Sequence, residues 1–199
     1  MISIDKTGKV NFNYKTMARI ISSIWQTVDG IIDSSTMDKW FAPFHSDARG
    51  KYINDIIQDC EAMLYGRLTY EMLASYWAQQ KNNEFGVADK LNNTKKYLVS
   101  TTLKQADWGE TAIISNNVPQ EVRKLRDRNQ GNILMQGSAS LVNLLIKEKL
   151  LDELRLLTNP YIGGTGKRLF EDEINQVLQL IEERKIDNGV IISIYQFKY

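Results

Sequence analysis

Residues 132–170, with the sequence NILMQGSASLVNLLIKEKLLDELRLLTNPYIGGTGKRLF, decide the fold. The short apolar run at 133–135 is typical of a buried strand and ends at the pair Gly137-Ser138. Leucines at helical spacing follow in 141–145, and a second apolar run, 154–157, leads into a glycine-rich loop. Strand, glycine turn, helix, strand and glycine loop together predict a βαβ unit. Ligands bind beyond the carboxyl ends of the strands in such units, and a helix N-terminus there favours phosphate, so we expect an anion or nucleotide site.

Composition narrows the class of protein. A chain of 199 residues is long enough for one domain with a full hydrophobic core. Its net charge of +1 gives no electrostatic reason to expect nucleic acid or an anionic membrane as a partner. The single cysteine, Cys60, excludes an internal disulfide, and with one histidine, His45, a metal site could be built only from carboxylates. No apolar run approaches the roughly 20 residues that span a bilayer, so we expect a cytoplasmic protein that acts on a small molecule.

The N-terminal residues 1–16 stand apart from the rest. Apolar and polar residues alternate on both sides of Gly8, which predicts a β-hairpin. A leader ahead of an internal start at Met17 is the alternative. Residues 17–199 are expected to form one domain.

The remaining pattern alternates strands and helices. Strands are predicted at 19–25, 62–65, 96–100 and 111–115. Helices are predicted after Ser46, after Thr69 and near Pro119, with Thr69 as an N-cap and Cys60 on the buried stripe of the first. Segments 177–186 and 190–199, joined by Asp187-Asn188-Gly189, predict a hairpin. The order predicts an α/β fold with three layers, a mostly parallel sheet and a C-terminal antiparallel β-hairpin.

Five short motifs carry a resemblance to a known family. Gly66-Arg67-Leu68-Thr69-Tyr70-Glu71 follows a predicted strand, and there the chain resembles the dihydrofolate reductase fold, whose Gly-Arg-x-Thr turn holds cofactor phosphate. Four others resemble the C-terminal domain of RibD, the bifunctional riboflavin-biosynthesis enzyme, and its stand-alone relatives. They are Thr27-Val28-Asp29-Gly30, Gly137-Ser138-Ala139-Ser140-Leu141, Leu151-Asp152-Glu153-Leu154 and residues 160–170. The motifs come in the order expected of the family, and the resemblance covers roughly residues 18–199.

The chain also departs from its relatives. It lacks the zinc-deaminase signature of the bifunctional enzyme, so it cannot deaminate. It has Gly137-Ser138-Ala139 where family members often have consecutive glycines. Dihydrofolate reductases place a carboxylate on the helix after the first loop to hold the pteridine. Asp47 and Asp55 lie on that helix here, but neither sits in a matching motif.

The resemblance implies a function. We expect an NADPH-dependent reductase that acts by hydride transfer on a small heterocyclic or imine-like substrate. The relative it implies is 5-amino-6-(5-phosphoribosylamino)uracil reductase of riboflavin biosynthesis. Relatives commonly pair, so a homodimer is expected. The alternatives are a non-catalytic NADP-binding module that keeps the fold and a pterin reductase of the dihydrofolate type.

The candidate cofactor residues lie at strand ends. A helix N-terminus with an arginine suits a nucleotide phosphate, and an arginine there favours NADPH over NADH. The cofactor-binding residues expected are Thr27, Gly66, Arg67, Thr69, Ser100, Thr101, Gly137, Ser138, Ala139, Gly163, Gly164 and Gly166. Each of these residues also has a purely structural alternative. Thr69 could only cap a helix, and Arg67 could be a solvated surface charge. Ser100, Thr101 and Gly137 to Ala139 could only form turns, and the loop with Gly163, Gly164 and Gly166 could be a flexible surface loop.

Asp29 is the expected catalytic and substrate-binding carboxylate, because it ends a central strand near the expected nicotinamide. Its alternative is an ordinary Asp-Gly turn. Trp40 is a second substrate-binding candidate, because a loop aromatic can stack on a flat heterocycle, although such residues often only pack locally.

Overall fold

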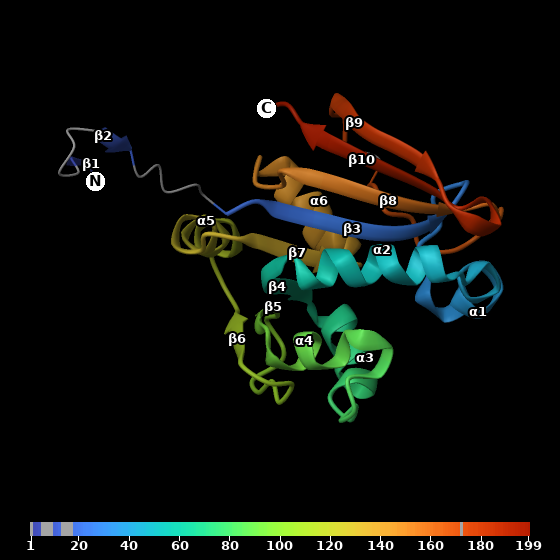
Figure 1. Cartoon of the computed structure of the whole chain (residues 1–199), viewed down its shortest axis with the longest axis horizontal. Coiled ribbons are helices and arrows are strands. Elements are labelled where there is room, and N and C mark those ends of the chain that lie inside the picture. The colour runs from blue at the N-terminus through green and yellow to red at the C-terminus, as the bar shows by residue number, and fades with distance from the viewer. Residues whose placement is uncertain (1, 5–9, 13–17, 172) are drawn as a thin grey trace.

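The computed structural model describes residues 2–4, 10–12, 18–171 and 173–199. Eight of its strands form one sheet in the order β6-β5-β4-β7-β3-β8-β10-β9 (Figure 1). These strands are β3 (Ile20–Thr27), β4 (Cys60–Gly66), β5 (Lys95–Val99), β6 (Thr111–Ile114), β7 (Asn132–Gln136), β8 (Glu153–Asn159), β9 (Leu178–Lys185) and β10 (Ile191–Phe197). The α-helices are α1 (Met37–Trp40), α2 (Asp47–Gln58), α3 (Arg67–Trp77), α4 (Ala88–Asn93), α5 (Val118–Arg128) and α6 (Ala139–Lys147).

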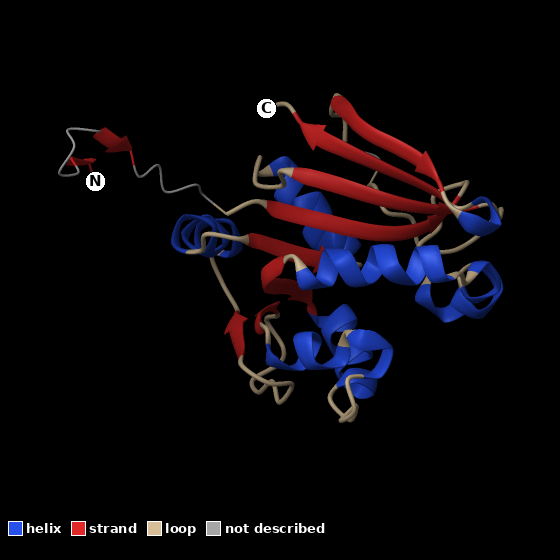
Figure 2. Ribbon diagram, in the orientation of Figure 1, coloured by secondary structure: helices blue, strands red, loops and turns tan. Residues whose placement is uncertain are grey.

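The sheet is parallel from β6 to β8 and antiparallel at its last two strands. β3 pairs in parallel with β7 and β8, while β10 runs antiparallel to both β8 and β9. Figure 2 shows helices in front of and behind this sheet. The α/β fold with three layers, a mostly parallel sheet and a C-terminal hairpin is confirmed.

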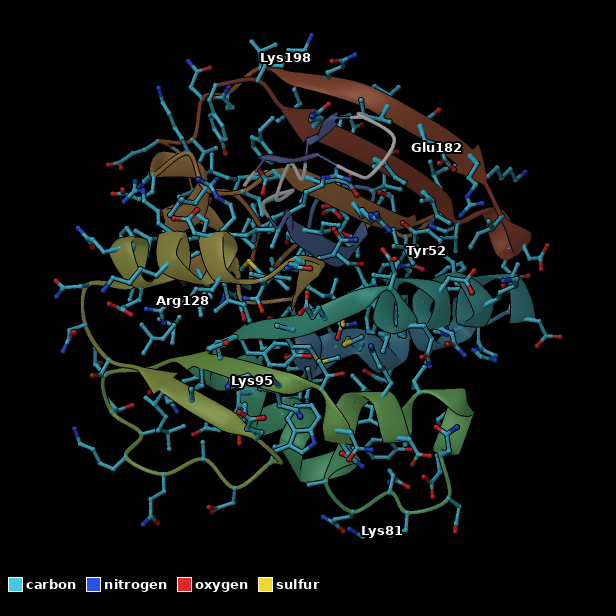
Figure 3. The ribbon with its side chains drawn as sticks, turned by 60° about the vertical axis from the view of Figure 1, so that its left-hand side comes forward. Tyr52, Lys81, Lys95, Arg128, Glu182 and Lys198 are labelled. Carbon is cyan, nitrogen blue, oxygen red and sulfur yellow. The ribbon has the colours of Figure 1, made fainter. Side chains whose placement is uncertain are left out.

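Alternation along the central strands builds the two cores. Ile133 and Met135 of β7 belong to the cluster under α5 and α6, whereas Leu134 belongs to the cluster under α2, α3 and α4. All three are fully buried because helices cover both faces of the sheet, and side chains of a strand point to opposite faces in turn. Figure 3 shows Tyr52 on α2, and this residue packs in the second cluster with Val190 and Ile192 around β10.

Two local predictions were wrong. Helix α3 begins at Arg67 after an extended Gly66, so Thr69 lies inside the first turn and is not the N-cap. Cys60 begins β4 and is not on the stripe of α2, which ends at Gln58; its thiol donates to the Ile57 carbonyl at 3.1 Å. By contrast Ser46 caps α2 as expected, because its hydroxyl accepts from the backbone N–H of Arg49 at 3.2 Å.

The two hairpins differ in how much of them is described. β9 and β10 are joined by η4 (Asp187–Gly189), where Asn188 has φ 58° and Gly189 has φ 76°, as the turn motif predicts. At the other end β1 (Ile2–Ile4) pairs antiparallel with β2 (Val10–Phe12), and the intervening turn lies outside the described residues. None of the helices in the described part of the chain has the length and apolar character that a membrane span requires.

Three short 3-10 helices complete the described elements. They are η1 (Ser34–Thr36), η2 (Ala42–Phe44) and η3 (Glu84–Gly86). The first two flank α1 in the long connection between β3 and α2. That connection borders the cavities described next.

Candidate functional site

The neighbouring parallel strands β4 and β7 form a switch point in the sheet, because the connections that follow them leave on opposite faces. β4 leads into α3 on one face of the sheet, and β7 leads into α6 on the other. A crevice forms at such a switch point because the two helices diverge from the carboxyl ends of adjacent strands. Neither helix has a side-chain cap at its N-terminus, so the first amides of both are available to an anion.

A set of hydrogen bonds joins the two glycine turns. The Ser138 hydroxyl accepts from the Gly66 N–H at 2.9 Å and donates to the Thr69 hydroxyl at 3.0 Å. The Ser138 N–H donates to the same Thr69 oxygen at 3.1 Å. Because the Thr69 oxygen accepts twice, its own proton points elsewhere, and the described residues offer it no acceptor. Thr69 can therefore donate to a ligand in the crevice.

The first cavity, called here the Arg67 cavity, has a volume of about 300 Å³ and lies over these turns. Arg67, Thr69 and Ser138 line it, with Lys167 from the glycine-rich loop. Arg67 is paired with Glu71 at 2.9 Å, and each of the two side chains is 42% exposed. An exposed pair of this kind contributes little, so Arg67 is free to turn to a bound phosphate.

The second cavity, the Trp40 cavity, has a volume of about 330 Å³. It shares Leu68, Thr69, Ser138 and Lys167 with the Arg67 cavity, so the two are continuous. Gly137 and Ala139 line it, and Gly137 has φ 62°, with the Thr69 hydroxyl 3.0 Å from where a Cβ would lie. The structure thus brings Gly66, Arg67, Thr69, Gly137, Ser138 and Ala139 together.

Trp40 is a fixed wall of this cavity. It is buried, and its indole N–H donates to the Asp33 carbonyl at 3.1 Å and to the Thr36 hydroxyl at 3.2 Å. Its polar atom is therefore satisfied within its own loop, and only the ring offers a surface to a ligand.

The third cavity, the Arg49 cavity, has a volume of about 490 Å³ and joins the second through Trp25, Leu73 and Gln136. Trp25 stacks on Phe41 with ring centroids 4.3 Å apart and planes 13° apart. Asp47 lines this cavity but is exposed, whereas Asp55 does not line it and pairs with Lys51 at 2.8 Å.

Asp29 and Thr27 lie outside all three cavities. The Asp29 carboxylate accepts from the Thr27 hydroxyl at 2.6 Å and from the N–H groups of Gly163 and Gly164, each at 2.8 Å. These hydrogen bonds, the one from Thr27 first, lower the pKa of Asp29 to about 2. A carboxylate that is ionised and accepts three hydrogen bonds has no proton to give, so Asp29 does not fit the role of proton donor expected of it. Asp29 instead fastens the glycine-rich loop to the end of β3.

The glycine-rich loop packs closely on the turn after β3. A Cβ on Gly163 would come within 2.8 Å of Ile31, and Gly166, with φ 137°, would meet Ile31 and Asp33. Gly164 has open space around it. The three glycines do not line the cavities. Lys167, which follows Gly166, lines both the Arg67 cavity and the Trp40 cavity, and the close fit of the loop holds it there.

Ser100 and Thr101 follow β5 and line none of the three cavities. Ser100 is buried, and its hydroxyl accepts from the N–H groups of Thr102 and Leu103 at 3.3 and 3.0 Å. Thr101 is exposed. The neighbouring Val99 reaches the Arg67 cavity instead.

Sequence reasoning missed several lining residues, among them Lys167, Gln136 and Trp25. Each was visible next to a chosen motif: Gln136 precedes Gly137, Lys167 follows Gly166, and Trp25 lies in the strand before Thr27. Strand periodicity could have pointed to Trp25. Among the described residues, no cluster of three or more His, Cys, Asp or Glu side chains could hold a metal ion.

The chain is similar to several known proteins. The uncharacterized protein YyaP of Bacillus subtilis (strain 168) is 28% identical over 182 residues, which are 90% of this chain and 95% of that protein. A putative riboflavin biosynthesis protein from Shewanella sp. PV-4 superposes with a TM-score of 0.70 at 17% identity, covering 91% of this chain and 99% of the other. Dihydrofolate reductase from Enterococcus faecalis, solved with NADP(H), superposes with a TM-score of 0.62 at 13% identity, covering 91% and 97%.

The two structures share the overall fold of this chain. A family model described as the RibD C-terminal domain matches residues 18–192, from just before β3 to the second residue of β10. The chain belongs to the RibD C-terminal domain family.

Proposed function

We propose that the chain is an NADPH-dependent reductase of a small heterocyclic or imine-like substrate, similar to 5-amino-6-(5-phosphoribosylamino)uracil reductase. One observation carries the proposal: two uncapped helix N-termini, those of α3 and α6, meet at a cavity that also holds Arg67 and Lys167. Amides with a positive dipole end and two cations suit the phosphates of a dinucleotide. Membership of a family with reductases among its structural neighbours supports the same reading.

The residues present fit this cofactor. Arg67 offers a planar fork for the 2′-phosphate that distinguishes NADPH from NADH, and Lys167 adds a point charge between the Arg67 and Trp40 cavities. The Thr69 hydroxyl has a proton to donate into the same space. When bound, the cofactor supplies a hydride.

In the reaction the protein itself would position the cofactor and the substrate and would exclude water from them. The Trp40 cavity, walled by Ile24, Trp25, Trp40 and Ala139, has the apolar character that suits a nicotinamide ring. The Arg49 cavity continues from it across Trp25, Leu73 and Gln136, so a substrate there would lie beside the ring. Trp25 and Gln136 form the shared wall and would orient both molecules.

The experiment is a titration of NADPH and NADH on the wild type, Arg67→Ala and Lys167→Ala. We expect the wild type to prefer NADPH and Arg67→Ala to lose most of that preference, because the arginine reads the extra phosphate. Lys167→Ala should weaken both nucleotides. Lys81→Ala is the matched control, since Lys81 is exposed beyond the other end of α3 (Figure 3).

Turnover is the second measurement. Loss of NADPH absorbance should follow addition of a ribosylamino-pyrimidine, a dihydropterin or a nitro compound. Tight NADPH binding with no oxidation by any of the three would favour the non-catalytic NADP-binding module. Equal affinity for NADPH and NADH in every variant would contradict the role given to Arg67.

A further inference from the structure

Arg49 carries a charge for which the described residues offer no counter-ion. The residue is only 3% exposed, yet no carboxylate lies within 4 Å of its guanidinium among the described residues. Burying an unpaired charge is costly unless something compensates it. Burial accordingly lowers the pKa of Arg49 from its ordinary value, although an arginine stays protonated in proteins.

The guanidinium is held in a layered stack. Its Nη1 donates to the Phe41 carbonyl at 2.6 Å, and its Cζ lies 3.9 Å above the Phe41 ring. Phe41 stacks in turn on Trp25, and the Arg49 Nη2 lies 3.4 Å from the His45 Nδ1. A guanidinium has five N–H donors, so these two acceptors leave several unused. Arg49 lines the Arg49 cavity, where those donors are available to a ligand.

The other charged residues around this cavity do not neutralise Arg49. Lys51 is 76% exposed and paired with Asp55. Asp47 is the one carboxylate among the described lining residues, and it is exposed to solvent at the start of α2. The buried part of the wall is therefore positive. A second donor lies in the same wall, because the buried indole nitrogen of Trp25 has no hydrogen-bond partner among the described residues.

We propose that the Arg49 cavity binds a flat organic anion, whose charged oxygens pair with the Arg49 guanidinium and whose ring packs beside Trp25 and Phe41. Trp77 and Phe85 also line this cavity and supply further aromatic surface, with ring centroids 6.3 Å apart. The inference rests on the proposed function, because the anion would be the substrate of the reductase or a part of it.

The test compares an anion with a neutral molecule of the same shape. 2-Naphthoate and 2-naphthamide are titrated without NADPH, with tryptophan fluorescence and calorimetry as readouts. We expect the wild type to bind 2-naphthoate at least about tenfold more tightly, as a hydrogen-bonded charge pair supplies. Arg49→Gln should bind the two equally. Arg49→Lys keeps the charge without the planar fork, so it should retain part of the preference.

Arg128→Gln is the matched control, because it removes an exposed arginine on α5 that lines none of the three cavities and should leave the preference unchanged. Equal binding of the two compounds by the wild type would overturn the proposal, and this comparison needs no variant. A preference that survives in Arg49→Gln would also overturn it. If Arg49→Gln does not fold, Arg49→Lys takes its place. A wild-type preference for 2-naphthoate in Arg49→Lys would contradict pairing with the planar guanidinium, and a reduced preference would support it.

The two proposals fail separately. The naphthoate titration contains no nicotinamide cofactor, so the absence of NADPH binding would sink the reductase and leave this result standing. Conversely, if the protein binds NADPH but binds naphthoate and naphthamide equally, only the anion-binding proposal is overturned and the proposed reductase stands.

Discussion

The Thr69 hydroxyl oxygen accepts two hydrogen bonds from Ser138, one from its N–H at 3.1 Å and one from its hydroxyl at 3.0 Å. Thr69 lies in the first turn of α3 and Ser138 is the N-cap residue of α6, and these two helices lie on opposite faces of the sheet. Ser138 has φ 60°, a left-handed conformation that costs a non-glycine residue about 1–2 kcal/mol. The pair holds the crevice at the switch point to a fixed width.

Thr69→Val should loosen this crevice. The substitution keeps the shape but removes the acceptor of both Ser138 donors, so we expect the free energy of unfolding to fall by about 1–3 kcal/mol and NADPH to bind more weakly. Chemical denaturation and nucleotide titration measure the two effects. Ser115→Ala is the control, because Ser115 is exposed, lines none of the three cavities and makes no side-chain hydrogen bond among the described residues. If Thr69→Val is as stable as the wild type, the hydrogen bonds between Thr69 and Ser138 do not stabilise the crevice.

Gly137→Ala and Gly50→Ala should change stability in opposite directions. Gly137 has φ 62°, and a Cβ would lie 3.0 Å from the Thr69 hydroxyl, so the alanine should destabilise the fold by more than about 1 kcal/mol. Gly50 lies in α2 with nothing within 4 Å of a new Cβ, so the alanine should stabilise by about 0.5–1 kcal/mol. Thermal unfolding of both variants checks the signs, and two losses or two gains would contradict the prediction.

Asp29→Asn should remove an acid-sensitive part of the stability. The folded-state pKa of about 2 lies below the ordinary 3.8, so the unfolded chain binds the proton more readily as the solution becomes acidic. The stabilisation is complete above about pH 4 and is lost as the pH falls towards 2. Wild type and variant should therefore converge in stability over that interval, measured by denaturation at successive pH values. Asp38→Asn, at an exposed position, is the control. A constant difference would refute the assignment.

Lys96 should make the fold more stable at high pH. It is buried, donates to the Thr94 carbonyl at 2.8 Å, and lies 4.6 Å over the Trp108 ring. Burial lowers the pKa of Lys96 from 10.5 to about 8. Between these values the unfolded chain binds the proton and the folded chain does not, so the contribution of this group to stability rises with pH across that interval.

Lys96→Met lacks this titration, so the stability of the wild type relative to the variant should rise from pH 8 to pH 10.5. Burial raises the pKa of Cys60 to about 11, an effect of opposite sign, and because Cys60 and Lys96 interact electrostatically the comparison is made with Cys60→Ala in both proteins. The exposed Lys104→Met serves as the comparison. A relative stability that is flat or falls with pH would contradict the shift.

The strands and glycine turns could be predicted because each depends on neighbours in sequence. The period of β7 and the apolar spacing of α6 are local, and so is the Asp187-Asn188-Gly189 turn. The direction of a side chain is not local. Thr69 has the sequence of an N-cap, yet its hydroxyl is used by Ser138, 69 positions later.

The same limit explains Asp29. It forms the turn that its sequence predicts, but its carboxylate is taken up by Gly163, 134 positions away. The resemblance led to the correct strand ends, so Arg67, Thr69 and Ser138 were found beside the crevice. It did not separate residues that line the cavities from those, such as Thr27 and Ser100, whose hydroxyls brace the loops behind them.

The place of β3 in the sheet has a consequence for how the chain folds during synthesis. Its two partners, β7 and β8, end at Gln136 and Asn159, so more than half of the protein is made before either edge of β3 can be covered. Until then β3, with its isoleucines at 20, 21 and 24, presents open edges to other chains. Pairing over such separations is slow, so the nascent chain should depend on protection from aggregation until its last third emerges.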